Sequence, residues 1–159
     1  MDLTPKRAAD SATEMVQVVL PNDANPLGFI LGGTVMHLID IAGAIAGHRH
    51  TRSLLVTVAV DDLHFLHSIK VGDLIILKSR VTCVFTTSLE VHVDVYSEET
   101  LTGKRRLTSQ AFLTFVAIDR AGNRVRVPPL IVETEDEQRE CREAHARREQ
   151  RLLRKAASS

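Results

Sequence analysis

Apolar and polar positions along the chain predict one long buried helix and five strands. Residues 34–48 are apolar or small around most of a helix's circumference, which is typical of a helix surrounded by other elements. Alternating or valine-rich stretches predict strands at residues 15–20, 53–66, 74–88, 89–99 and 106–119. The last four strands have hairpin-like connections, so we expect antiparallel pairing between neighbours. A sheet curled around the helix, in a two-layer α+β domain, is the simplest packing of these elements.

The two ends of the chain are polar. Residues 1–13 predict a loose, flexible segment ahead of a single domain over residues 14–132. Residues 133–159 form a charged C-terminal helix with acidic residues early and basic residues late, which suits the helix dipole. We expect this helix to be solvated, and an oligomer contact through Leu152 and Leu153 is the alternative.

Composition narrows the function classes. Twenty basic and twenty acidic residues cancel, whereas a nucleic-acid module normally carries a basic excess, so we expect no nucleic-acid partner. No apolar run reaches the ~20 residues that span a bilayer, and the N-terminus lacks the apolar part of a signal peptide. We therefore expect a cytoplasmic protein without a membrane partner. Cys83 and Cys141 have no paired spacing, which predicts two reduced thiols and no metal site.

Asp40 is the misfit in the apolar helix. An isolated charge is costly in an apolar setting, so its presence needs a reason. Small residues such as Gly43 and Ala44 share its helix face and leave room for a narrow substrate. Desolvation raises the proton affinity of a carboxylate at such a position, which suits a general base.

Gly32 and Gly33 precede this helix and could let a carbonyl oxygen approach its unpaired N–H groups as an oxyanion site. Asp40 lies about 10 Å further along the helix axis, at 1.5 Å per residue. That span is too long for both groups to act on one carbonyl from one helix. A site shared between two subunits would remove the difficulty.

Three sequence blocks carry a resemblance to a known family. In order, they are "PNDANPLGFILGGTVMHLIDIAGAIA", "VTVAVDDLHFLHSIKVGD" and "AFLTFVAID". Together they resemble the hotdog-fold acyl-CoA thioesterases, in the subgroup of the brain acyl-CoA hydrolase and its single-domain bacterial counterparts, over residues 15–130. The resemblance implies a five-stranded antiparallel sheet around the helix. It also implies a homodimer with active sites at the subunit interface, often assembled as a hexameric trimer of dimers.

The family's function comes with the same resemblance. It implies hydrolysis of acyl-CoA to a free fatty acid and CoA, with no cofactor because CoA belongs to the substrate. Asp40 matches the family's catalytic aspartate, and Asn25 matches its asparagine partner. Asp40 could activate water or attack directly, and we favour the general-base role. Thr57 interrupts a valine strand and is a further candidate for lining the site.

Candidate contacts for the phosphates of CoA lie in two places. Lys104, Arg105 and Arg106 form a basic stretch near a strand start, and Arg can fork onto phosphate oxygens. Thr87 and Ser88 lie in a turn where related enzymes often carry a basic residue, which is missing in this chain. Their hydroxyls are the alternative contacts.

Three other functions compete with hydrolysis. An enoyl-CoA hydratase would need a histidine where Gly28 and Phe29 lie. A non-catalytic acyl-CoA sensor would bind its ligand without releasing CoA. A metal enzyme using His48 and His50 would lack a nearby third ligand.

Overall fold

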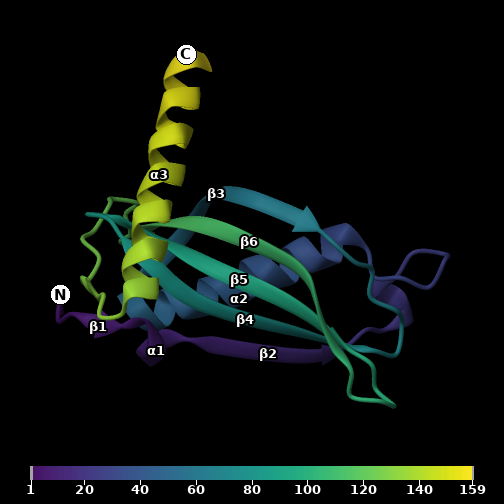
Figure 1. The fold of residues 1–159 in the computed structure, drawn as a ribbon. Helices are drawn as coiled ribbons and strands as arrows, with labels where there is room; N and C mark the ends of the chain where they lie inside the picture. The colour runs from purple at the N-terminus through teal and green to yellow at the C-terminus, as the bar shows by residue number, and fades with distance from the viewer. Residues whose placement is uncertain (1, 159) are drawn as a thin grey trace.

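The chain folds as a curved antiparallel sheet wrapped around one long helix, with a second long helix on the sheet's outer face (Figure 1). A computed structural model describes residues 2–158. The elements are, in chain order, β1 (Lys6–Arg7), α1 (Ala8–Ser11), β2 (Thr13–Val18), the 3-10 helix η1 (Pro21–Asp23), α2 (Gly32–Thr51), β3 (Leu54–Phe65), β4 (Leu74–Val84), β5 (Ser88–Glu98), β6 (Arg105–Ile118), β7 (Leu130–Ile131) and α3 (Glu135–Ser158). The predicted long helix, the five predicted strands and the two-layer α+β class are confirmed.

Small residues let α2 lie close to the sheet. Ala42 and Ala46 are fully buried, and Ile39 is 1% exposed in the same core. A Cβ on Gly47 would come within 2.6 Å of Leu55 Cδ1, which shows how closely β3 approaches the helix there. The helix ends at Thr51, and Arg52 caps it in the left-handed conformation with φ 52°.

The strand order in the main sheet is β2-β4-β5-β6-β3. The expectation of pairing between neighbouring strands holds for β4, β5 and β6, but it is wrong for β3 and β4. The segment between those two strands passes the start of α2, where Ile30 N–H donates to Ile69 O at 2.8 Å. β4 therefore begins on the other side of the helix from β3, and β3 pairs with β6 at the sheet's edge.

The two faces of β5 follow the alternation in the sequence. The inward residues Leu89, Val91, Val93 and Val95 are fully buried in the core under α2. On the opposite face, Glu90 is only 1% exposed. An acidic residue on the outer face of a sheet is so deeply buried only if something covers it, and α3 does so.

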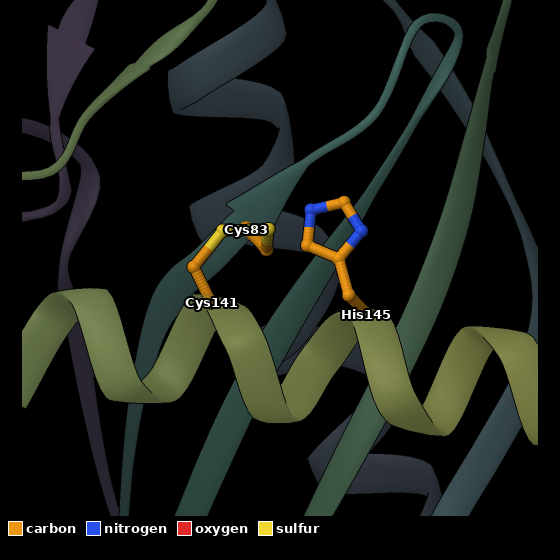
Figure 2. A group of neighbouring side chains, drawn as sticks. All are labelled: Cys83, Cys141 and His145. Carbon is orange, nitrogen blue, oxygen red and sulfur yellow. A yellow bond between two sulfur atoms is a disulfide. The ribbon is translucent and has the colours of Figure 1, made fainter.

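The two cysteines form a disulfide, so the expectation of two reduced thiols is wrong (Figure 2). The sulfurs of Cys83 on β4 and Cys141 on α3 are bonded, and the Cα atoms are 4.8 Å apart. Their separation of 58 residues concealed the pairing. It arises because α3 turns back over the sheet after β7.

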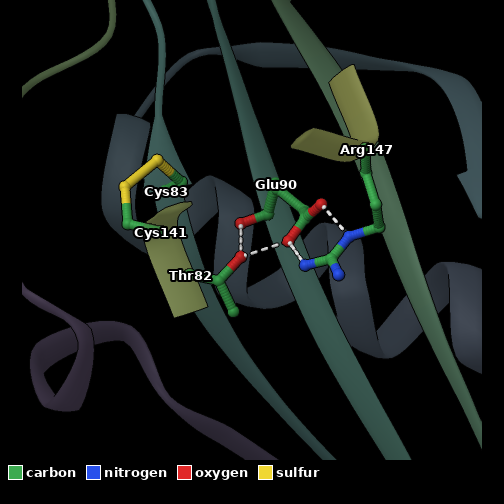
Figure 3. The surroundings of a disulfide bond; sticks show 5 residues. All are labelled: Thr82, Cys83, Glu90, Cys141 and Arg147. Atoms are coloured by element: carbon green, nitrogen blue, oxygen red, sulfur yellow. Dashed lines mark hydrogen bonds and ion pairs between the residues drawn. A yellow bond between two sulfur atoms is a disulfide. The ribbon is translucent and has the colours of Figure 1, made fainter. Parts of the chain in front are cut away.

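Helix α3 packs on the sheet from Cys141 to Arg151, which corrects the expectation of a solvated helix (Figure 3). Arg147 donates to both carboxylate oxygens of Glu90 at 2.9 Å, and the Thr82 hydroxyl donates to Glu90 Oε1 at 2.6 Å. The Arg147 guanidinium also lies 3.6 Å from the ring centroid of Phe112. Burial opposes the charge of Arg147, but the hydrogen bonds and charge of Glu90 outweigh it and raise the pKa of Arg147 above its usual value, so Arg147 stays charged.

Residues 1–13, expected to be loose, contain two short elements in their described part. β1 pairs in parallel with β7, and Lys6 aligns with Leu130. The Lys6 ammonium donates to the carbonyl oxygen of His50 at 2.8 Å, at the C-terminal end of α2 where carbonyls lack helical partners. Among residues 2–158, no helix is long and apolar enough to cross a membrane.

We predict that Cys141→Ser lowers the free energy of unfolding of the oxidised protein by ~2–4 kcal/mol, because the disulfide restricts the unfolded chain. Urea unfolding without reductant measures the loss. Reductant should lower the stability of the wild type by a similar amount and leave the variant unchanged. Equal unfolding midpoints for the two oxidised proteins would contradict the prediction.

The buried His50 predicts a pH dependence of stability. Its Nε2–H donates to Pro128 O at 2.8 Å, and Nδ1 has no hydrogen-bond partner among the described residues. Burial lowers the pKa of His50, against the opposing effect of the bond to Pro128. The unfolded chain therefore binds the proton more readily, and the free energy of unfolding should fall as the pH drops below about 6.5.

Thermal unfolding between pH 8 and 5 tests this dependence. His50→Gln should reduce the loss of stability below pH 6.5. His48→Gln, at an exposed histidine on the same end of α2, should leave that loss unchanged. Equal pH dependence in both variants would show that His50 is not responsible.

Candidate active site

The only acidic residue of α2 faces strand β3. Thr57 Oγ1 on β3 donates a hydrogen bond to Asp40 Oδ1 at 2.7 Å. Asp40 is half-buried, and a register shift in the β3–β6 pairing follows immediately after Thr57. One carboxylate oxygen is thus held by the sheet edge, and Oδ2 has no hydrogen-bond partner in residues 2–158.

A cleft of about 350 Å³ lies beside this pair, between α2, β3 and β6. Its lining is apolar apart from a few side chains, and it comprises Gly33, Met36, His37, Ile39, Asp40, Thr57, Val60, Leu63 and Leu113. Asp40, Thr57 and Gly33, three of the residues expected at the site, are therefore brought together. An apolar slot with one carboxylate and one hydroxyl suits an acyl group beside a hydrolytic base.

Asn25 and Gly32 do not line this cleft. Asn25 lies in the loop before α2, where its Oδ1 accepts from the backbone N–H groups of Leu27 at 3.0 Å and Phe29 at 3.1 Å. This is an Asx-type turn, and it leaves the Nδ2 donors of Asn25 without a partner in the described chain. A Cβ on Gly32 would meet the ring of Phe65 at 3.6 Å, so that position faces β3.

The candidate phosphate contacts lie at opposite ends of β5. Thr87 and Ser88 line a cavity of about 530 Å³ beside the β4–β5 turn. Lys104 and Arg106 line another, of about 580 Å³, at the β5–β6 turn, and Arg105 pairs with Glu98 at 3.1 Å. The eleven residues of β5 span ~33 Å, so one chain does not bring the two groups onto the same phosphate.

Two arginine side chains that the local sequence did not reveal line the cavity at Thr87 and Ser88. Arg126, from the segment before β7, and Arg148, from α3, line it together with these hydroxyls. The turn itself lacks a basic residue, as noted from the sequence. No local pattern signals the two arginines, because both reach the cavity only through the docking of distant segments.

The residues considered as metal ligands have other contacts. His48 Nδ1–H donates to Ser53 O at 2.9 Å and His50 to Pro128 O, so the two rings serve different carbonyl groups. Ligand atoms of Cys83, Cys141 and His145 lie within 4.8 Å of one another, a grouping that the sequence did not suggest (Figure 2). Both sulfurs are bonded to each other, and the His145 ring lies edge-on against Phe85.

Known proteins are similar to this chain in sequence. The family pattern of the thioesterase superfamily matches residues 27–104. An acyl-CoA thioester hydrolase of Bacillus subtilis is 43% identical over 119 residues, which cover 75% of this chain and 69% of that protein. The human cytosolic acyl coenzyme A thioester hydrolase is 32% identical over 90% of this chain, which spans only 38% of that relative's length.

Solved structures extend the similarity to the whole fold. An apo-hexameric acyl-CoA thioesterase has a TM-score of 0.90 and 40% identity, covering 96% of this chain and 98% of that one. The acyl-CoA hydrolase of Staphylococcus aureus, solved with butyryl coenzyme A and coenzyme A, has a TM-score of 0.87 and 32% identity, covering 96% and 93%.

Further structures of the S. aureus enzyme carry alanine in place of an asparagine, an aspartate or a threonine. Those three positions follow one another at the same intervals as Asn25, Asp40 and Thr57.

The helix inside a wrapped antiparallel sheet, together with the similarity to solved acyl-CoA hydrolases, places this chain in the class of hotdog-fold hydrolases. Within that class, the chain belongs to the acyl-CoA thioester hydrolase family of the thioesterase superfamily.

Proposed function

We propose that this protein hydrolyses acyl-CoA to a carboxylic acid and free CoA, with Asp40 as the general base. The observation that carries the proposal is the Asp40 carboxylate, fixed through one oxygen by Thr57 and directed at an apolar cleft. The acyl chain occupies the cleft, and the thioester carbonyl lies next to Asp40. The similar S. aureus enzyme was solved with butyryl coenzyme A, which supports this substrate class.

The reaction follows from the free carboxylate oxygen. Asp40 Oδ2 accepts a proton from a water molecule as that water attacks the thioester carbonyl carbon. The C–S bond then breaks, the CoA sulfur leaves as a thiolate, and the proton held by Asp40 returns to that sulfur. Water and thioester are consumed, acid and thiol are formed, and the carboxylate is regenerated without a cofactor.

Oxyanion stabilisation requires donors close to the carbonyl oxygen. We assign this role to Asn25 Nδ2 and to the N–H groups at the start of α2, at Gly32 and Gly33. Asn25 lies outside the cleft that contains Asp40 of its own chain, and the N–H groups at the start of α2 lie about 10 Å from Asp40 along the helix axis, so we assign these donors to the second subunit of a dimer. The free Nδ2 donors of Asn25 support this role.

Strand β3 is the surface that we propose for this dimer. It lies at the sheet edge, and unpaired edges readily accept another strand. It also exposes large apolar side chains: Leu54 (50%), Val56 (44%), Val58 (54%) and Val60 (43%). Pairing of two β3 strands would cover them and place two copies of α2 side by side. The hexameric relative supports further assembly as a trimer of dimers.

We place the CoA phosphates in the cavity at Thr87 and Ser88. Its lining carries Arg126 and Arg148 and no acidic residue. The cavity at Lys104 and Arg106 also contains Asp73 and Glu99, which offset part of its positive charge. Arg105 is further neutralised by Glu98, so that end of β5 is the second choice.

Asp40→Asn tests the base directly. The amide keeps the shape and the bond from Thr57 but cannot take a proton, so kcat should fall about 10²–10⁴-fold. A thiol-reactive dye measures CoA release, and circular dichroism checks folding.

Asp62→Asn is the matched control, because Asp62 is an exposed β3 aspartate with positive φ, which asparagine tolerates. Thr57→Ser should retain more activity than Thr57→Val. Full activity in Asp40→Asn would disprove the mechanism, and binding without turnover in the wild type would indicate a sensor.

The phosphate assignment predicts contrasting effects on KM. Arg126→Ala should raise KM for acyl-CoA about tenfold with little change in kcat, because a charged hydrogen bond is lost, whereas Arg106→Ala should not. An S-acyl pantetheine substrate, which lacks the nucleotide phosphates, is the control and should show no difference between the variants. The reverse pattern would place the phosphates at Lys104 and Arg106.

A further inference from the structure

Helix α3 carries Cys141 and His145 on one face, next to Cys83 of β4. Residues four apart on a helix are neighbours, so these two side chains leave α3 in the same direction. The sulfurs of Cys83 and Cys141 and a ring nitrogen of His145 all lie within 4.8 Å of one another. Figure 2 shows the imidazole beside the two sulfurs. Three side chains that can bind a metal ion therefore converge here from two elements.

Phe85 holds the His145 ring in this place. Phe85 comes two residues after Cys83, and its ring lies edge-on against the imidazole, with the ring centroids 4.9 Å apart. The Arg148 guanidinium lies 4.9 Å from the centroid of the same phenyl ring. Neither nitrogen of His145 has a hydrogen-bond partner among residues 2–158. Packing positions the imidazole, and its nitrogens remain available to a ligand.

Ion pairs keep α3 on the sheet independently of the disulfide. Just before Cys141, Glu140 binds Arg80 of β4. Two residues past the histidine, Arg147 binds Glu90 of β5 at 2.9 Å. These contacts lie on either side of the cysteine and the histidine of α3. Reduction of the disulfide therefore leaves two thiols and an imidazole close together and does not release the helix.

We propose that the reduced protein binds a zinc ion through Cys83, Cys141 and His145. Two thiolates and one imidazole are an established ligand set of zinc, with water as the fourth ligand. Zn–S distances of ~2.3 Å and Zn–N distances of ~2.0 Å place the ligand atoms ~3.6–3.8 Å apart around a tetrahedral ion. Once the bond between them is broken, the sulfurs reach this spacing by rotation of the two side chains. The histidine nitrogen, within 4.8 Å of both, needs a shift of only about 1 Å.

The cavity of about 530 Å³ beside the β4–β5 turn gives the ion access to these ligands. Cys141 and His145 both line it, whereas Cys83 is fully buried. Arg126 and Arg148 line the same cavity. Nearby cations favour the thiolate form of cysteine, which is the form that binds a metal. The two thiolate charges balance the charge of Zn²⁺.

The disulfide and the zinc site exclude each other, because sulfurs that are bonded together offer no thiolate. A phosphine reductant converts the first into the second. Its phosphorus gives two electrons to the disulfide and takes the oxygen of one water molecule, and the two protons of that water pass to the sulfurs. Zinc then displaces both protons. Only the reduced chain therefore binds the ion.

Cobalt titration of the reduced, metal-free protein tests the site, because Co²⁺ occupies zinc sites and its bonds to thiolates give a charge-transfer absorption band. We expect one equivalent of Co²⁺ to bind with this band, and added Zn²⁺ to abolish it. The protein kept oxidised should show no band. Absence of the band from the reduced wild type overturns the proposal.

His145→Gln tests the third ligand, because it keeps both cysteines. Zinc affinity, measured against a competing chelator, should fall about tenfold or more, since even a residue behind a metal ligand contributes that much. His67→Gln is the matched control at an exposed histidine between β3 and β4, and its affinity should equal that of the wild type. Return of the disulfide after removal of the reductant verifies that both variants keep the cysteines adjacent. Equal affinity in His145→Gln and the wild type would contradict the three-residue site.

Discussion

The hydrogen bond from Thr57 to Asp40 is the interaction on which the site depends. A carboxylate in the wall of an apolar helix loses much of its hydration, and without a partner that loss is costly. Thr57 compensates part of it from the neighbouring strand, at 2.7 Å, and leaves one oxygen facing the cleft. The same bond couples α2 to the sheet edge, so the fold and the chemistry share one contact.

The outer face of the sheet also carries a buried carboxylate, and its charge is balanced differently. Glu90 is buried on the side of the sheet that would face solvent in a bare two-layer domain. Its charge is balanced by a two-pronged bond from Arg147 and a hydroxyl of Thr82, so it has no oxygen free for proton transfer (Figure 3). The comparison shows why Asp40, and not the more deeply buried Glu90, is the candidate base.

Hydrophobic periodicity in the sequence predicted most of the secondary structure. The apolar helix, the five strands and the inward row from Leu89 to Val95 all follow from local patterns, and Asp40 and Thr57 meet because both face the core side of neighbouring elements. The strand order could not be predicted from local pattern, since it depends on how the segment between β3 and β4 passes α2.

The packing of α3 on the sheet could not be predicted from local pattern either. A polar helix gives no apolar stripe to predict its packing, yet a disulfide and the ion pairs Arg80–Glu140, Arg147–Glu90 and Arg151–Asp61 hold α3 on the sheet. Arg126 and Arg148 could not be assigned to a phosphate cavity for the same reason.

A crystal structure with a non-hydrolysable thioether analogue of acyl-CoA would show where the substrate lies relative to Asp40. We predict an acyl chain in the cleft beside Met36 and Val60, with a water molecule between Asp40 Oδ2 and the carbon that replaces the thioester carbonyl carbon. We also predict that Asn25 of the partner subunit is the nearest side-chain donor to that carbon. An acyl chain bound elsewhere, with both oxygens of Asp40 occupied by protein groups, would contradict it.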